Sequence, residues 1–214
     1  SILDLSPLGH QPMASADGRY VIVFNGEIYN FQQLRGELEP LGHSWRGHSD
    51  TEIMLAAFQQ WGVLEATRRF NGMFAFALWD RSARTLHLAR DRLGIKPLYY
   101  AVLPDGMLLF GSELKSLLAH GGLRKDIDPL ALEDYFALGY VPEPRTIYRG
   151  ARKLPPAHTL TLQRGVAPRL AEYWRPSFDS SRPLSLEAAI PELQERLREA
   201  VKLRMVAEVP LGAF

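Results

Sequence analysis

Two unbroken apolar runs constrain the fold more than any other feature of the chain. Residues Tyr20–Phe24 and Met73–Trp79 contain no charged or amide side chain and show no alternation of polar and apolar positions. A strand with one face in water alternates, so unbroken runs predict strands that are covered on both faces. Two sheets packed together beneath outer helices would bury all of these faces. The sequence therefore predicts a layered α+β fold.

Helical spacing and turn residues complete the expected order of elements. Further strands are expected at 86–89, 98–101, 107–110 and 159–162, and helices at 31–41, 49–61, 112–119, 129–138 and 186–205. Ser49 followed by Glu52 is a capping-box pattern. Because a proline inside a helix costs roughly 3 kcal/mol, we expect the last helix to start near Pro191.

Composition excludes several classes of partner and site. The 25 basic and 24 acidic side chains leave a net charge of +1, which gives no reason to expect nucleic acid or an anionic membrane as partner. The longest apolar run is too short to cross a bilayer, and no signal peptide is visible. The chain has no cysteine, and its six histidines show no ligand spacing, so no metal site is expected. A reducing, cytoplasmic setting is the expectation.

A cluster of polar residues follows the first apolar run. Asn25, Gly26 and Glu27 come directly after it, and Asp50 opens the helix that follows Ser49. An Asn amide beside an unobstructed backbone N–H could stabilise an oxyanion during amide hydrolysis, and a carboxylate could hold a substrate ammonium. An Asn-Gly pair is also a common turn, and an Asp at a helix start complements the helix dipole. Taken alone, the residues favour the structural reading.

Longer motifs of the sequence favour the functional interpretation of these residues. Residues 24–30, 49–52, 90–100, 111–116 and 209–214 resemble, in this order, motifs of the glutamine-dependent asparagine synthetase family. The resemblance implies a glutaminase domain with the four-layer α/β/β/α sandwich of N-terminal-nucleophile hydrolases. It also implies that Asn25 and Gly26 form the oxyanion hole, that Glu27 lines the glutamine pocket, and that Asp50 holds the substrate amine. Ser1, Ile2 and Leu3 resemble a family stretch that forms a wall of this pocket.

The resemblance also divides the chain. It implies a glutaminase domain over residues 1–174 that lacks its first strands, a linker over 175–185, and the opening helix and strand of an α/β nucleotide-binding domain over 186–214. Both ends therefore look truncated. The family's nucleophile is an N-terminal Cys, which this sequence lacks, so we expect the fragment to be inactive. The ATP and Mg²⁺ of the family would serve the whole protein, and no residue of the fragment is expected to bind them.

The family's reaction gives the expected function of the whole protein. Ammonia from glutamine would attack an aspartate carboxylate activated with ATP, so glutamine, aspartate and ATP are the expected small-molecule partners, with a homodimer as an option. Two alternatives stay open. The acceptor could be another carboxylate, as in surface polysaccharide synthesis, or the chain could be a non-catalytic amidotransferase-like binding module.

Other family-like segments are expected to be structural. For residues 90–100 we expect a tight connection between strands in which Arg and Asp pair with each other. Ser112 is expected to cap the helix that follows it, with Glu113 or Lys115 available to face an interdomain tunnel. We expect His48 to lie in a surface loop.

Overall fold

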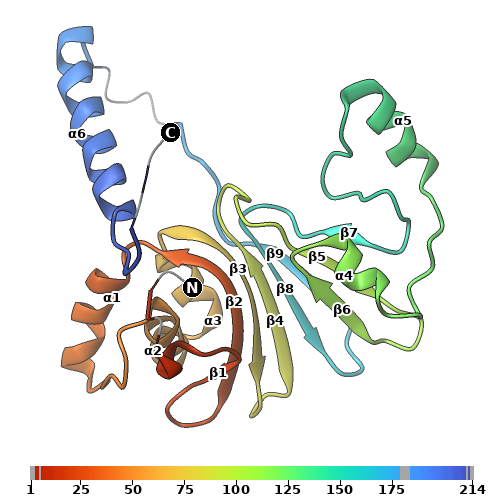
Figure 1. Cartoon of the computed structure of the whole chain (residues 1–214), viewed down its shortest axis with the longest axis horizontal. Helices are drawn as coiled ribbons and strands as arrows, with labels where there is room; N and C mark the ends of the chain where they lie inside the picture. Colours follow the sequence, from red (N-terminus) through yellow and green to blue (C-terminus); the bar gives the residue numbers. More distant parts are fainter. Residues whose placement is uncertain (1–2, 5, 179–183, 211, 213–214) are drawn as a thin grey trace.

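The computed structural model describes residues 3–4, 6–178, 184–210 and 212, and shows two antiparallel sheets with helices (Figure 1). The larger sheet has the strand order β1-β2-β3-β4-β8-β9, and the smaller one has the order β6-β5-β7. The strands of the larger sheet are β1 (Met13–Ala14), β2 (Tyr20–Ile28), β3 (Gly72–Asp80), β4 (Thr85–Arg90), β8 (His158–Gln163) and β9 (Arg169–Glu172). Those of the smaller sheet are β5 (Tyr99–Val102), β6 (Leu108–Gly111) and β7 (Arg152–Lys153). Every pair of neighbouring strands is antiparallel, which makes the fold α+β.

The helices begin and end close to the positions that their capping residues predict. They are α1 (Phe31–Leu38), α2 (Asp50–Trp61), α3 (Val63–Arg69), α4 (Leu114–Leu118), α5 (Pro129–Leu138) and α6 (Leu186–Arg204), with 3₁₀ turns at Pro7–Gly9 and Glu39–Leu41. Ser49 caps α2 by accepting a hydrogen bond from the Glu52 N–H. The Glu52 carboxylate accepts from Arg46 and Gly47 rather than from Ser49, so only one half of the expected capping box forms.

Three buried clusters separate the layers. The largest lies between one face of the larger sheet and helices α1 to α3, with Ile22 and Phe76 from the sheet and Phe58 from α2. The second lies between the two sheets and includes Leu88, with Tyr100 of β5 packed against it. The third lies between the smaller sheet and α4, where Leu117 is buried. The expected burial on both faces is therefore present for β3.

The first strand differs from the prediction in length and in burial. β2 continues through Ile28 because β3 is equally long and pairs with it as far as the Ile28–Gly72 pair. Asn25, Gly26 and Glu27 therefore lie inside the strand rather than in a turn after it. The face of β2 toward the smaller sheet is not fully covered, since Val23 is 36% exposed. The prediction of two buried faces is wrong for this strand.

The last helix and the segment after it also correct the sequence reading. α6 begins at Leu186, because Ser185 accepts a hydrogen bond from the Ala188 N–H, and it carries Pro191 inside it. The start near Pro191 is wrong. The strand expected at 209–214 is absent from its described residues 209, 210 and 212, because a strand needs a neighbour to pair with and the described chain offers none there. The remaining residues of that segment lie outside the described part of the chain.

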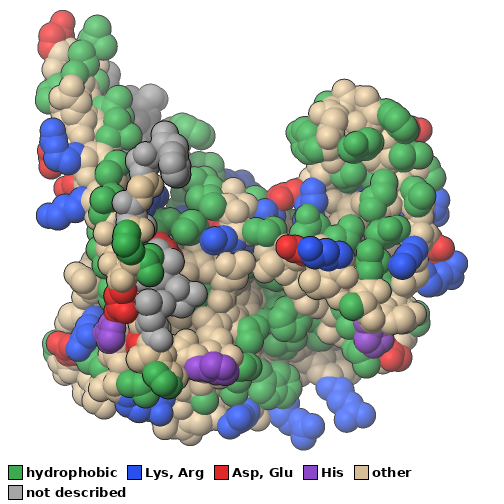
Figure 2. Space-filling view, viewed as in Figure 1, with side chains coloured by type: hydrophobic (Ala, Val, Ile, Leu, Met, Phe, Trp, Pro, Cys, Tyr) green, Lys and Arg blue, Asp and Glu red, His purple; other side chains and the backbone are tan. Residues whose placement is uncertain are grey.

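Two helices project from the sheets with apolar side chains exposed. Figure 2 shows such side chains along α5 and along α6, on opposite sides of the molecule. Phe136 of α5 is 78% exposed, and Leu193 of α6 is 59% exposed. Within the described ranges, no helix is both long enough and apolar enough to span a membrane.

Candidate functional site

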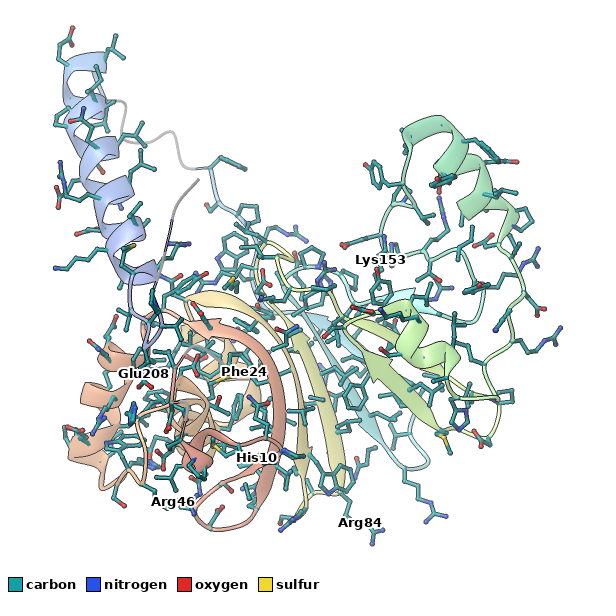
Figure 3. All side chains as sticks on the ribbon, in the orientation of Figure 1. His10, Phe24, Arg46, Arg84, Lys153 and Glu208 are labelled. Carbon is teal, nitrogen blue, oxygen red and sulfur yellow. The ribbon has the colours of Figure 1, made fainter. Side chains whose placement is uncertain are left out.

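The outer edge of β2 presents three N–H groups next to one another. The Phe24 N–H donates to Gln11 Oε1 at 2.6 Å, and the Ile28 N–H donates to Asp50 Oδ2 at 2.9 Å. Gly26 lies between them and points the same way, because alternate residues of a strand share one direction of their N–H groups. Phe74, which faces Gly26 across the sheet, uses both its N–H and its carbonyl on Asp91. The Gly26 N–H is therefore directed away from β3, toward the edge that Phe24 marks in Figure 3.

Glycine is required at position 26 for two reasons. Its φ of +150° is a conformation that side chains with a Cβ rarely adopt. A Cβ at this position would lie 2.0 Å from the Met73 carbonyl oxygen. Glycine at position 26 therefore allows β3 to approach closely and also supplies the free backbone N–H.

Asp50 is brought to this edge by the start of α2. Its side chain is buried, and Oδ2 accepts the hydrogen bond from Ile28, while Oδ1 is 3.4 Å from Thr51 Oγ1. Burial raises the pKa of the Asp50 carboxyl above its ordinary value, and the Ile28 N–H partly offsets this effect. The N-terminus of α2 also favours a negative charge here.

A pocket of about 200 Å³ lies at this edge. Its walls come from residues 24–27 of β2, Asp50 and Thr51 of α2, Gln11, Met73 and Lys96. The Glu27 carboxylate accepts no hydrogen bond from any described residue. Burial raises the pKa of Glu27, the charge of Asp50 raises it further, and the charge of Lys96 lowers it. The pocket therefore combines two carboxylates, one ammonium group and a backbone donor.

Asn25 connects the two sheets rather than forming a turn. Its amide Nδ2 donates to Ser112 Oγ at 3.3 Å, across from β2 to the end of β6. Glu113, not Ser112, occupies the N-cap position of α4, and no side chain caps that helix. The prediction of a Ser112 cap is wrong, because the hydroxyl accepts from Asn25 instead. Glu113 and Lys115 form an exposed ion pair with each other.

In the charged segment at residues 90–97, the side chains of Arg90 and Asp91 bond to backbone groups rather than to each other. The four backbone N–H groups of Phe74, Leu93, Ile95 and Lys96 donate to the fully buried Asp91 carboxylate. The Arg90 guanidinium donates to the carbonyls of Gly94, Lys96 and Leu154 and pairs with Glu143. The expected Arg–Asp pairing is wrong, since backbone groups and Glu143 satisfy both charges. The expected packing role fits these contacts.

The remaining predicted residues do not all reach the pocket. Ser1 and Ile2 lie outside the described residues. Leu3 is buried in the large cluster beneath α2 and is not part of the pocket wall formed by the described residues. Leu3 and Asp4 lie outside any strand, and Asp4 has a φ of +53°. His48 is in an exposed loop, as expected, where it contacts Glu208.

Sequence reasoning missed Gln11 and Lys96 as wall residues. Gln11 lies in a segment with no pattern, and no signal in the sequence connects it to the Phe24 N–H. Lys96 belongs to the charged segment that we interpreted as packing. Its backbone is held by hydrogen bonds with the side chains of Arg90 and Asp91. The alternation of charges in the sequence does not predict these bonds.

Comparison with known proteins decides the family. A family model described as glutamine amidotransferase domain matches residues 1–174. The chain belongs to the glutamine amidotransferase family. The amidotransferase chain is 36% identical over 217 residues to "Asparagine synthetase [glutamine-hydrolyzing] 1" of Bacillus subtilis, with 100% of the chain and 33% of that protein covered. It is also 35% identical over 217 residues to "Amidase chry2" of Gibberella zeae, with 100% and 31% covered.

A solved structure supports the same fold. The B. subtilis glutamine phosphoribosylpyrophosphate amidotransferase in complex with ADP and GMP matches with a TM-score of 0.56 and 18% identity. The match covers 79% of the amidotransferase chain and 33% of the other chain. The chain thus spans about a third of the length of the curated relatives that it matches.

Proposed function

We propose that the pocket at the outer edge of β2 binds glutamine and that the chain is the glutaminase part of a glutamine-hydrolysing asparagine synthetase. One observation carries the proposal: in an amidotransferase fold, one pocket is lined by Gly26, with its outward N–H, and by two carboxylates, Glu27 and Asp50. A free amino acid with a side-chain amide needs both an oxyanion donor and an acceptor for its ammonium.

Each pocket residue then has a chemical role. The Gly26 N–H and the Asn25 amide would stabilise the oxygen of the glutamine side-chain amide as negative charge develops on it. Asp50 Oδ1, the less engaged oxygen, would accept from the substrate ammonium, with Glu27 adding negative potential. The 214 residues contain no cysteine, so we assign the attacking thiol to other parts of the protein and expect no glutamate release from this chain alone.

The synthetase half of the reaction is proposed from the relatives' names. The whole protein would use ATP and Mg²⁺ to activate the aspartate carboxylate, and ammonia from glutamine would convert it to the amide. In the described part of the chain no glycine-rich turn opens a helix, so these residues do not fit a phosphate-binding role. A cytoplasmic location and a homodimer stay predictions.

A second acceptor has an observation in its favour. The chain is about as identical to the protein named an amidase as to the B. subtilis synthetase. An amidotransferase for another carboxylate, including one in surface polysaccharide synthesis, would use the same glutamine pocket. A non-catalytic binding module would keep the pocket without turnover.

We also propose that the layers form the four-layer α/β/β/α sandwich of N-terminal-nucleophile hydrolases. The three buried clusters support this assignment, because they fill the spaces between helices and sheet, sheet and sheet, and sheet and α4. The helix α6 would then begin the next domain, after a linker at 175–185.

Binding of L-glutamine to the ¹⁵N-labelled chain tests the pocket. Titration should shift the amide resonances of Gly26, Glu27 and Asp50, and Asp50→Asn should weaken binding. Asp105→Asn, at an exposed turn, serves as the matched control and should not. The pocket assignment is wrong if no resonance moves at ligand concentrations on the order of 10 mM.

The full reading frame that contains these residues tests the reaction. Supplied with ATP, aspartate and glutamine labelled with ¹⁵N in its amide, the protein should form ¹⁵N-asparagine. Ammonia release without asparagine would identify another acceptor. Glutamine binding without ammonia release would identify a binding module.

A further inference from the structure

The two sheets leave a second cavity at the end of β3 that lies away from the proposed glutamine pocket. Ala75 faces Asn25 across β2 and β3, whereas Trp79 lies further along β3 by roughly 13 Å, at about 3.3 Å per residue. The cavity beside Trp79 has a volume of about 600 Å³, against about 200 Å³ for the proposed glutamine pocket. Small organic molecules bind in cavities of roughly 300–1,000 Å³. The second cavity is therefore large enough for a ligand of its own.

Three hairpin turns contribute to this cavity. They connect β3 to β4, β5 to β6 and β8 to β9, and they lie at one end of the two sheets (Figure 1). The first turn supplies Arg84, the second supplies Asp105 and Gly106, and the third supplies residues 164–168. Segments that are remote in sequence thus line one cavity.

The lining between these turns is apolar and only partly covered. Leu86 and Leu108 line the cavity and pack against the buried cluster between the sheets. Trp79, Val102 and Val166 are 38%, 41% and 57% exposed. An apolar ligand would remove this surface from water, and the indole ring of Trp79 could stack against a second ring. The lining therefore favours a ligand with a flat apolar body.

Two guanidinium groups add positive charge to the same cavity. Arg84 and Arg164 both line it, and neither side chain forms an ion pair or a hydrogen bond with any described residue. Asp105 is the acidic residue of the described lining, and its Oδ1 accepts from the Met107 N–H at 3.0 Å. A guanidinium group can bind a carboxylate through two parallel hydrogen bonds. The excess of unpaired cations therefore favours an anionic ligand.

The backbone of Arg84 gives a further reason to expect a role for its side chain. Arg84 lies at the end of the β3–β4 hairpin (Figure 3) and has a φ of +50°, which is uncommon for a residue with a Cβ. Glycine or asparagine would adopt this conformation at a lower cost. The turn instead carries a long cationic side chain that pairs with no described group.

We infer that the cavity between the three hairpin turns binds a small organic anion with a flat apolar body. The ring system would lie against Trp79, Leu86 and Leu108, and the anionic group would accept hydrogen bonds from Arg84 and Arg164. None of these residues lines the proposed glutamine pocket, so this is a second site.

A matched pair of probes, 2-naphthoate and 2-naphthamide, tests the inference, because the two share a ring system and differ in charge. The indole N–H resonance of Trp79, identified with Trp79→Phe, reports binding to the ¹⁵N-labelled chain. 2-Naphthoate should shift it with a Kd of about 1 mM or tighter, and 2-naphthamide should bind at least about 5-fold more weakly. The resonance of Trp61, which packs against Arg69 outside the cavity, should not move.

Replacing both arginines tests how the charge is recognised. The double variant Arg84→Met and Arg164→Met should reduce the preference for 2-naphthoate to less than about 2-fold. Arg81→Met is the matched control and should leave the preference unchanged. It removes the same charge from the same turn, but Arg81 donates to the Gly18 carbonyl at 3.1 Å and does not line the cavity.

Three results would overturn the inference. The first is no shift of the Trp79 resonance with 2-naphthoate at about 10 mM, or an equal shift of Trp61. The second is equal binding of the two probes, and the third is an unchanged preference in the double variant. Because glutamine takes no part in this experiment, the proposed function stands or falls separately.

Discussion

Asp91→Asn tests whether one buried carboxylate holds the segment that carries Lys96. Its Oδ1 accepts from Leu93 at 3.1 Å and Ile95 at 3.0 Å, and its Oδ2 accepts from Phe74 at 3.2 Å and Lys96 at 2.9 Å. An asparagine replaces one oxygen with an NH₂ group. Whichever way the amide turns, two backbone N–H groups then face a donor.

The orientation of the introduced amide determines how much stability the chain loses. Leu93 and Ile95 are 72% and 52% exposed, so water can reach their N–H groups more easily than those of Phe74 and Lys96. The NH₂ group should therefore turn toward Leu93 and Ile95. Each lost acceptor costs about 1–3 kcal/mol, and partial access to water favours the lower end, which gives about 2–4 kcal/mol in total. This is a large share of the roughly 5–15 kcal/mol that stabilises a folded domain.

Urea unfolding followed by circular dichroism measures the loss. Asp91→Asn should lower the midpoint with an unchanged slope, and Asp91→Ala should lower it further because four N–H groups lose their acceptor. Asp105→Asn provides the control, since Asp105 accepts one N–H at an exposed turn and should cost about 1 kcal/mol or less. A loss below about 0.5 kcal/mol for Asp91→Asn would refute the assignment of these bonds.

Three further variants, with Gly36→Ala as the control for the first, test the site and the sheet by thermal or urea unfolding. Gly26→Ala should cost about 3 kcal/mol or more, because its Cβ would overlap the Met73 carbonyl, whereas Gly36→Ala, with open space around it in α1, should stabilise the chain by up to about 1 kcal/mol. Glu27→Gln should raise the melting temperature at pH 7, since burial and a neighbouring carboxylate raise the pKa of Glu27; the gain should vanish below about pH 4, where glutamate is protonated in both states. Asp80→Asn should show the opposite profile, because a guanidinium hydrogen bond lowers the pKa of Asp80. The substitution should cost about 1–3 kcal/mol at pH 7 and progressively less as the pH falls below about 4. If the difference in stability between a variant and the unmodified chain is the same at about pH 7 and about pH 3, the pKa shift assigned to that residue is contradicted.

The sequence predicted the helices and turns whose first or last residue is set by a neighbouring capping residue, proline or glycine. Pro129 and Asp128 start α5 where expected, and Gly42 ends the 3₁₀ turn after α1. The two-residue strands β1 and β7 were not predicted, because two residues carry no periodicity and only their partners make them strands. β9 and the short helix α3 were missed as well. The length of β2 depends in the same way on β3, which is remote in sequence.

The family resemblance, and not the local pattern, singled out the residues of the candidate pocket, since Asn25, Gly26, Glu27 and Asp50 taken alone favoured a turn and a helix start. Asn25, Gly26 and Glu27 follow an apolar run, and Asp50 follows a cap. Lys96 was not predictable as a pocket residue, since Arg90 and Asp91 fix it through Phe74, Leu154 and Glu143. Those partners come from three distant parts of the chain.

The hydrogen bonds that a buried carboxylate accepts indicate whether it holds the protein backbone or remains available to a ligand. Asp91 and Asp50 are both buried aspartates, and both lie at the end or the start of an element. Asp91 accepts hydrogen bonds from four backbone N–H groups, whereas Asp50 accepts from the Ile28 N–H and from groups at the start of its own helix, and Glu27 accepts nothing from the described residues. Burial raises the pKa values of both Glu27 and Asp50, because it removes water from carboxylates that have no cationic partner among the described residues. A bound ammonium group would stabilise the charged form of these carboxylates and lower both pKa values. Glutamine binding should therefore release protons at a pH near those values, and its affinity should fall as the pH drops through them.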